Sequence, residues 1–317
     1  METVPIIHTQ SLTRDFKKTR AVDSLNLVIY PGELFGLIGP DGAGKTTTLR
    51  LLAGLLDITD GSATVAGYDL ASQSESIKAR IGYMAQQFSM YADLSVVENL
   101  AFFAELYNIK SSERVERTAR LLSFAGLTDY KDRRGGHLSG GMQKKLALVC
   151  TLIHQPPILL LDEPTTGVDP VSRQEFWNII SDLNLGGTTI IVSTPYMDEA
   201  DRCSRIGLMY AGRIMMCNTP QSIISQVEGE LIELYPEDWR TAQAFIKKLP
   251  GVLEVQTYGE SLHLLVDSAQ ERLPQIKKYL KTEGISYRRA RQTPVRMEEA
   301  LISLIRRMEQ NRETGNM

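Results

Sequence analysis

The segment GPDGAGKTT at residues 39–47 constrains the fold of this chain more than any other feature. It fits the pattern G-x-x-x-x-G-K-[ST] and joins an apolar run at 34–38 to a stretch of helical character at 45–56. In such a strand-loop-helix context, backbone N–H groups and a helix N-terminus converge on a phosphate. We therefore expect ATP here, with Lys45 on its β- and γ-phosphates and Thr46 on Mg²⁺. The candidate binding residues are Gly39, Pro40, Asp41, Gly42, Ala43, Gly44, Lys45, Thr46 and Thr47.

A second segment, ILLLDEP at 158–164, supplies two carboxylates at the end of an apolar run. Such a run predicts a fully buried parallel strand, and ligands of open α/β sheets bind at the carboxyl ends of their strands. We expect Asp162 to belong to the Mg²⁺ shell and Glu163 to orient or deprotonate the attacking water. Two acids at the end of an isolated strand more often mark an ordinary junction between strand and loop than a metal site. The functional interpretation therefore depends on the phosphate loop.

The third segment, LSGGM at 138–142, distinguishes between nucleotide-binding folds that share the first two. With it, the chain resembles the ATP-binding cassette (ABC) ATPases. The resemblance implies that Ser139, Gly140 and Gly141 open a helix whose N-terminus meets the γ-phosphate of ATP held by a second cassette. Ser139 also suits an ordinary N-cap after a glycine turn, and the two interpretations are compatible.

The same resemblance implies roles for three more residues. Gln86 falls at the family's Q-loop, where a glutamine contacts Mg²⁺ and the attacking water and links the site to a membrane subunit. Gln87 follows it, which leaves the register open by one residue. Phe16 is expected to stack on adenine, with an ordinary core phenylalanine as the alternative. Asp169, in Val168-Asp169-Pro170, matches the D-loop and is expected to contact the facing subunit.

One position departs from the family pattern. Members usually place a histidine in a context like S-T-H-x-x-D-E-A, and this chain has Ser193-Thr194-Pro195 followed by YMDEA. Proline offers neither a side-chain donor nor a backbone N–H, so the γ-phosphate is expected to lack one contact. Asp41 adds a carboxylate to the phosphate loop, and we expect its side chain to point outward because the loop binds through its backbone.

Composition limits the other partners. A net charge of −3 gives no electrostatic case for nucleic acid, and the three cysteines show no CxxC or metal spacing. We interpret them as reduced thiols of a cytosolic protein. The sequence has neither a signal-peptide pattern at its N-terminus nor a stretch approaching 18 apolar residues, so we expect any membrane role to come through a partner.

The predicted fold class is α/β. It comprises a P-loop NTPase ABC cassette, with a mixed core sheet, an antiparallel β subdomain and a helical subdomain, followed by a small α+β ferredoxin-like domain. We place the cassette at 1–225, its helical subdomain at about 87–155 and the second domain at 226–317. The second domain shows the order β-α-β-β-α-β and a last helix at 296–307 with Met297, Ala300 and Leu301 on one side. It carries no catalytic constellation, so we expect a dimerisation, stabilising or regulatory module.

The resemblance is nearest to the ATPase subunits of the ABC-2 export group. It implies a peripheral protein at the cytoplasmic face of the membrane that pairs with a second cassette, as a homodimer or heterodimer, and drives efflux through separate permease subunits. Residues near 86–100 are then expected to contact the permease, with Met90 and Tyr91 exposed. Pro195 keeps open a catalytically weak cassette acting as the regulatory half of a heterodimer. A soluble ABC ATPase acting on ribosomes or DNA is a further alternative.

Overall fold

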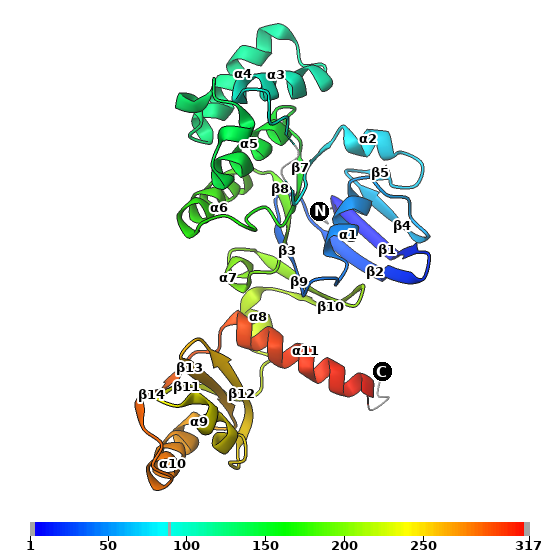
Figure 1. Cartoon of the computed structure of the whole chain (residues 1–317). Coiled ribbons are helices and arrows are strands. Elements are labelled where there is room, and N and C mark those ends of the chain that lie inside the picture. Colours follow the sequence, from blue (N-terminus) through cyan, green and yellow to red (C-terminus); the bar gives the residue numbers. More distant parts are fainter. Residues whose placement is uncertain (1–3, 88–89, 314–317) are drawn as a thin grey trace. The chain divides into compact units, whose positions relative to one another are not determined.

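The computed structural model describes residues 4–87 and 90–313. The chain divides into two compact units, Met1–Thr219 and Pro220–Met317 (Figure 1). Each unit has its own sheets and its own hydrophobic core. In the described part of the chain, no helix has the length and apolar character needed to cross a membrane.

A mixed six-stranded sheet forms the centre of the first unit, in the order β10-β9-β3-β8-β7-β6. In the described part of this sheet, β9 and β10 pair antiparallel and the other neighbouring strands pair parallel. Every residue of β3, β7 and β8 is buried, which explains their continuous apolar runs. The strands are β3 (Leu34–Ile38), β6 (Ile81–Met84), β7 (Ile158–Asp162), β8 (Thr189–Thr194), β9 (Arg205–Tyr210) and β10 (Arg213–Asn218).

An antiparallel sheet in the order β2-β1-β4-β5 accompanies the central sheet (Figure 1). Its inward residues share one core with α1 and β3. Leu49 and Leu52 of the helix belong to the same buried cluster as Ile7, Val22 and Leu37. The predicted helix at 45–56 is too long, because α1 ends at Leu52 and Gly54 takes φ 66°. The elements are β1 (Ile7–Phe16), β2 (Thr19–Ile29), α1 (Lys45–Leu52), β4 (Asp60–Val65) and β5 (Tyr68–Asp69).

Helices fill most of the interval between β6 and β7. Ser95 begins α3 with a capping box, since its hydroxyl accepts from the Glu98 N–H and the Glu98 carboxylate accepts from the Ser95 N–H. The helices of the insert are α3 (Val96–Leu106), α4 (Ser111–Phe124) and α5 (Gly140–Leu152), with single 3₁₀ turns at Thr128–Tyr130 and Gly135–His137. The other helices of this unit are α2 (Ser74–Lys78), α6 (Pro170–Leu185) and α7 (Met197–Ala200).

The second unit has the predicted β-α-β-β-α-β order within an antiparallel sheet, β12-β13-β11-β14. Ile232 and Leu264 face α9 and α10, whereas His263 lies on the other side of the sheet and contacts Glu299 of α11. The elements are α8 (Pro220–Ile224), β11 (Glu230–Pro236), α9 (Trp239–Ile246), β12 (Val252–Tyr258), β13 (Ser261–Val266), α10 (Ala269–Thr282), β14 (Tyr287–Thr293) and α11 (Met297–Glu313). Met297, Ala300 and Leu301 of α11 are buried, on the side expected from the sequence.

Candidate nucleotide site

The loop between β3 and α1 requires glycine at two positions for steric reasons. A Cβ atom at Gly39 would stand 2.1 Å from the carbonyl oxygen of Met209. Gly44 takes φ 105°, and a Cβ there would stand 2.3 Å from the carbonyl oxygen of Ala21. The loop therefore packs its backbone against neighbouring strands, while Asp41 and Gly42 remain exposed.

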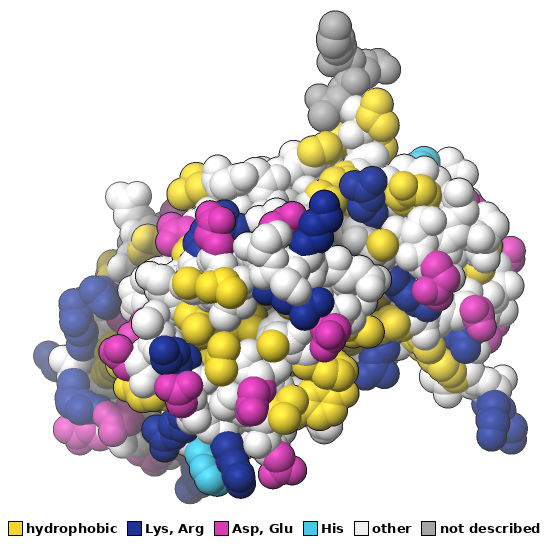
Figure 2. Space-filling model, turned by 90° about the horizontal axis from the view of Figure 1, so that it is seen from above, with side chains coloured by type: hydrophobic (Ala, Val, Ile, Leu, Met, Phe, Trp, Pro, Cys, Tyr) yellow, Lys and Arg dark blue, Asp and Glu magenta, His cyan; other side chains and the backbone are white. Residues whose placement is uncertain are grey.

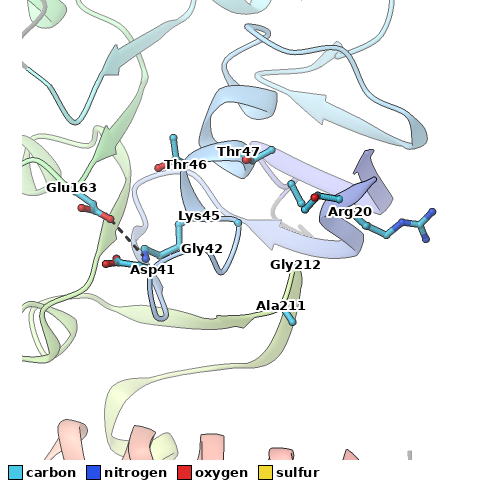
Figure 3. A pocket seen from close by; sticks show the side chains of 12 residues that line it. Arg20, Asp41, Gly42, Lys45, Thr46, Thr47, Glu163, Ala211 and Gly212 are labelled. Atoms are coloured by element: carbon cyan, nitrogen blue, oxygen red, sulfur yellow. Dashed lines mark ion pairs between the residues drawn. The ribbon is translucent and has the colours of Figure 1, made fainter. Parts of the chain in front are cut away.

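Lys45 begins α1 and is buried, with 4% of its surface exposed. Its Nζ atom donates to the carbonyl oxygens of Gly39, at 2.8 Å, and Pro40, at 3.0 Å. The same nitrogen lies 3.8 Å from Oε1 of Glu163 (Figure 3). These contacts hold the ammonium beside the loop and beside the end of β7. The surrounding pocket has a volume of about 300 Å³ and is lined by Thr19, Arg20, Ala21, Asp41, Gly42, Gly44, Lys45, Thr46, Thr47, Glu163, Ala211 and Gly212.

Two of the predicted metal ligands meet directly. Asp162 is fully buried at the carboxyl end of β7, and its Oδ1 accepts from the hydroxyls of Thr46, at 2.9 Å, and Ser193, at 2.8 Å. Its Oδ2 accepts from the Tyr83 hydroxyl at 3.3 Å. Burial raises the pKa of Tyr83 and keeps its hydroxyl a donor. A carboxylate beside a threonine hydroxyl is a donor set of hard oxygen atoms, which suits Mg²⁺.

Glu163 is held in a strained backbone conformation, with φ 44°. Its N–H lies 3.1 Å from the carbonyl oxygen and 3.0 Å from the hydroxyl of Ser193. Its Oε2 accepts from Gln86 Nε2, at 2.7 Å, and from the Thr166 hydroxyl, at 3.3 Å. Left-handed backbone at a non-glycine residue persists only when the surroundings impose it, and it concentrates at functional sites. The fold thus fixes this carboxylate beside Lys45.

The third motif lies at the start of α5. Ser139 caps the helix through its hydroxyl, which accepts from the Met142 N–H at 3.4 Å. Ser139 and Gly140 are exposed, whereas a Cβ at Gly141 would stand 2.5 Å from Cβ of Ser172. The first residues of the helix N-terminus are therefore open to solvent, and none of its three motif residues lines the pocket around Lys45.

The comparisons with known proteins agree with this geometry. Residues 22–166 match the family model "ABC transporter". "Daunorubicin resistance ATP-binding protein DrrA2" of Streptomyces coeruleorubidus is 35% identical over 284 residues, which are 88% of this chain and 88% of that protein. The chain belongs to the ABC transporter ATP-binding proteins. The family resemblance and the cassette fold predicted from the motifs are confirmed.

Other similar proteins are longer or shorter than this chain. "Probable multidrug ABC transporter ATP-binding protein YbhF" of Escherichia coli (strain K12) is 39% identical over 287 residues, 90% of this chain and 49% of that protein. The chain thus spans about half the length of this relative. Among solved structures, a dimeric post-hydrolysis state of the ATP-binding cassette MJ0796 bound to ADP and Pi has a TM-score of 0.62 and 26% identity. The match covers 67% of this chain and 98% of the MJ0796 chain.

One buried lysine of the ABC cassette lies beside the site although it belongs to none of the three motifs. Lys144 of α5 is buried, and its Nζ donates to the backbone carbonyl of Gln86 at 2.5 Å. Burial lowers its pKa, whereas the charges of Asp162 and Glu163 act in the opposite direction. The signature helix is therefore tied to Gln86, whose side chain in turn reaches Glu163. No local pattern marks Lys144, because its partner lies 58 residues away in sequence.

The D-loop residue and the aromatic candidate lie at the surface. Asp169 caps α6 by accepting from the N–H groups of Val171, at 3.1 Å, and Ser172, at 3.0 Å. The bonds from Ser172 lower its pKa. Phe16 is 41% exposed, and the Arg14 guanidinium lies 4.7 Å from the centre of its ring. Phe16 is absent from the pocket lining, where Thr19, Arg20 and Ala21 stand instead, so its contact with adenine stays a prediction.

Pro195 lies in the turn between β8 and α7 and is half-buried. The neighbouring Ser193 bonds to Asp162 and to the Glu163 N–H, which places the turn at the edge of the acidic pair. Asp41, for which an outward side chain was expected, is exposed and lines the pocket. The functional roles of the individual site residues remain predictions.

Proposed function

We propose that this chain is the ATP-hydrolysing subunit of an ABC exporter that drives substrate efflux through a separate membrane permease. The observation that carries the proposal is that Lys45, Thr46 and Glu163 line one pocket, with Asp162 bonded to Thr46 and a signature helix exposed for a second cassette. The names of several relatives include drug resistance or export, which supports the direction of transport.

The proposal gives each of these residues a step, and their geometry supports it. The phosphate loop and the Lys45 ammonium bind the β- and γ-phosphates. Thr46 and Asp162 would hold Mg²⁺, with Gln86 near the water, and the ion would neutralise charge on the phosphates. Glu163 accepts a proton from the attacking water or orients it, and general-base catalysis of this kind contributes about 10²- to 10⁴-fold in rate. Gln86 holds the Glu163 carboxylate by the bond of 2.7 Å.

A second cassette completes the site. Ser139, Gly140 and Gly141 would present the N-terminus of α5 to the γ-phosphate on the facing subunit, as the helix dipole favours. Asp169 would lie at that interface, since its exposed cap begins α6. Binding of two ATP molecules would close the dimer, and hydrolysis would reopen it.

The permease contact is proposed on the helical insert. Tyr91, Phe102 and Leu106 expose 48%, 37% and 60% of their surfaces, and the rings of Tyr91 and Phe102 lie 4.7 Å apart. Figure 2, viewed from the side on which α3 and α4 lie in Figure 1, shows apolar side chains gathered between charged ones. Residues 88–89, within the expected contact segment, lie outside the described residues. Docking to ABC-2 permease subunits would hold the chain at the cytoplasmic face of the membrane.

Steady-state phosphate release with Mg²⁺ and ATP tests the proposal. Glu163→Gln should abolish the activity while ATP still induces a dimer in size-exclusion chromatography. Glu75→Gln is the matched control, because its carboxylate is 84% exposed and lies outside the pocket. Equal trace activity in the unmodified chain and in Glu163→Gln would refute hydrolysis. A nucleotide-dependent membrane pull-down would identify the permease.

Pro195 favours a second candidate function, a cassette that binds ATP but hydrolyses it slowly beside an active partner in a heterodimer. The proline cannot donate a hydrogen bond to the γ-phosphate. Slow hydrolysis by the isolated chain, accelerated on mixing with a second cassette, would favour this candidate.

A further inference from the structure

Glu199 of α7 is a buried carboxylate with no role in the mechanism above. Only 1% of the residue is exposed. Its Oε1 accepts from the Thr165 hydroxyl at 2.6 Å, and its Oε2 accepts from the Thr194 hydroxyl at 2.5 Å. Each carboxylate oxygen is thus bonded to a different threonine.

The two threonines belong to the segments that matter most for hydrolysis. Thr165 follows Glu163 by two residues, and Thr194 immediately precedes Pro195. The Thr194 hydroxyl also accepts from the Tyr196 N–H at 3.0 Å, so both of its partners, Tyr196 and Glu199, follow the proline in sequence. Glu199 therefore bridges the loop after β7 to the turn after β8.

A second tether joins the same two regions. Arg173, in the first turns of α6, pairs with Asp198 at 3.1 Å. Its guanidinium also lies 5.0 Å from the centre of the Tyr196 ring. Asp198 is exposed, so this pair contributes little by itself, whereas the Glu199 bridge is shielded from water.

Burying a carboxylate is costly unless its hydrogen bonds are satisfied. Two apolar side chains could close the same space at lower cost in free energy, but they would not fix the direction of the two hydroxyls. A bonded carboxyl group does fix it, because loss of either bond leaves a buried oxygen atom without its donor.

We propose that Glu199 is a positioning residue for hydrolysis, which holds Glu163 in register with the Pro195 turn through Thr165 and Thr194. This inference rests on the proposed function, since it concerns the carboxylate that acts on water. The bridge restrains a turn in which Pro195 itself supplies no hydrogen-bond donor.

Three variants test the bridge. Thr165→Val replaces the hydroxyl by a methyl group, Glu199→Gln exchanges one acceptor for a donor, and Thr165→Ser restores the hydroxyl. We expect the first two to lower kcat by about 10- to 100-fold, because a small misplacement of a reacting group costs that much. KM for ATP should change less than about 2-fold, and the double variant should lose no more than the worse single one.

The controls separate positioning from general damage. Among the described residues, the Thr151 hydroxyl bonds only within α5, to the carbonyl oxygens of Ala147 and Leu148, so Thr151→Val should leave kcat unchanged. Thr165→Ser should recover kcat to within about 2-fold. If Glu199→Gln does not fold, the Thr165 pair still decides the question.

The inference is overturned if folded Thr165→Val hydrolyses ATP at the unmodified rate, or if kcat and ATP affinity fall together with the melting temperature. Absence of Mg²⁺-dependent hydrolysis in the unmodified chain would instead refute the proposed function.

Discussion

The backbone contact at Gly39 predicts a large loss of stability from a single methyl group. In Gly39→Ala, the new Cβ would stand 2.1 Å from the carbonyl oxygen of Met209 and 3.1 Å from its carbonyl carbon. Carbon–oxygen contacts in proteins lie near 3.3 Å, so the two segments must separate by roughly 1 Å. Because β3 is paired with both β8 and β9, that movement disturbs a ladder inside the buried sheet.

The size of the stability loss depends on whether side-chain or backbone atoms must move. Overpacking costs about 1–3 kcal/mol when side chains can adjust, and a clash with backbone belongs at the upper end, about 3 kcal/mol. In a unit of this size, each kcal/mol lowers the melting temperature by roughly 2–4 °C, which gives a loss of roughly 6–12 °C. ATP affinity should fall as well, because Lys45 Nζ donates to the Gly39 carbonyl at 2.8 Å.

Gly32→Ala is the matched control. Gly32 takes φ 76° and has open space around the position of an added Cβ, so only the left-handed strain of about 1–2 kcal/mol applies. Scanning calorimetry of the full chain should show a larger fall in melting temperature for Gly39→Ala than for Gly32→Ala. Fluorescence of the buried Trp177 identifies which transition belongs to the first unit. A Trp239→Phe background removes the signal of the second unit.

A melting temperature for Gly39→Ala equal to or above that of Gly32→Ala would refute the steric reasoning. It would mean that the loop can move away from Met209 at little cost. Unchanged ATP affinity in Gly39→Ala would refute the coupling between this contact and the position of Lys45.

Two further predictions concern the rate and the acid stability. Pro195→His should raise kcat for phosphate release by roughly 10-fold or more by adding a donor at the γ-phosphate; an unchanged rate would mean that another group already positions the water. In the second unit, burial pulls the pKa of Glu233 and Glu299 upward, but hydrogen bonds from Arg291 and His263 respectively leave both pKa values below the ordinary 4.5. Since a lowered folded pKa stabilises only the ionised form, that stability should disappear as pH falls from 4.5 through the lowered values. Calorimetry should therefore show the transition of this unit falling in acid, and His263→Ala should weaken that dependence.

Several elements could be predicted because their signals are local. The strands β3, β7 and β8 are buried on both faces, so each appears in the sequence as an apolar run. The start of α3 is marked by Ser95 followed three residues later by Glu98, and the structure has that capping box. The end of α1 was predicted too late, because Ala53 and Leu56, which extend the apolar pattern beyond Leu52, belong to a turn packed on the same core.

The amino-acid sequence by itself indicated the family and predicted a nucleotide site and a two-part layout, because motif spacing and periodicity are properties of neighbouring residues. The tertiary structure alone decided which side chains meet. Thr46 reaches Asp162 across 116 residues, and Glu199 reaches Thr165 across 34. Both contacts depend on the strand order β3-β8-β7, which brings the carboxyl ends of these strands to one edge of the sheet. The periodicity of the sequence predicts that a side chain is buried. Which residue that side chain contacts depends on how the strands pack.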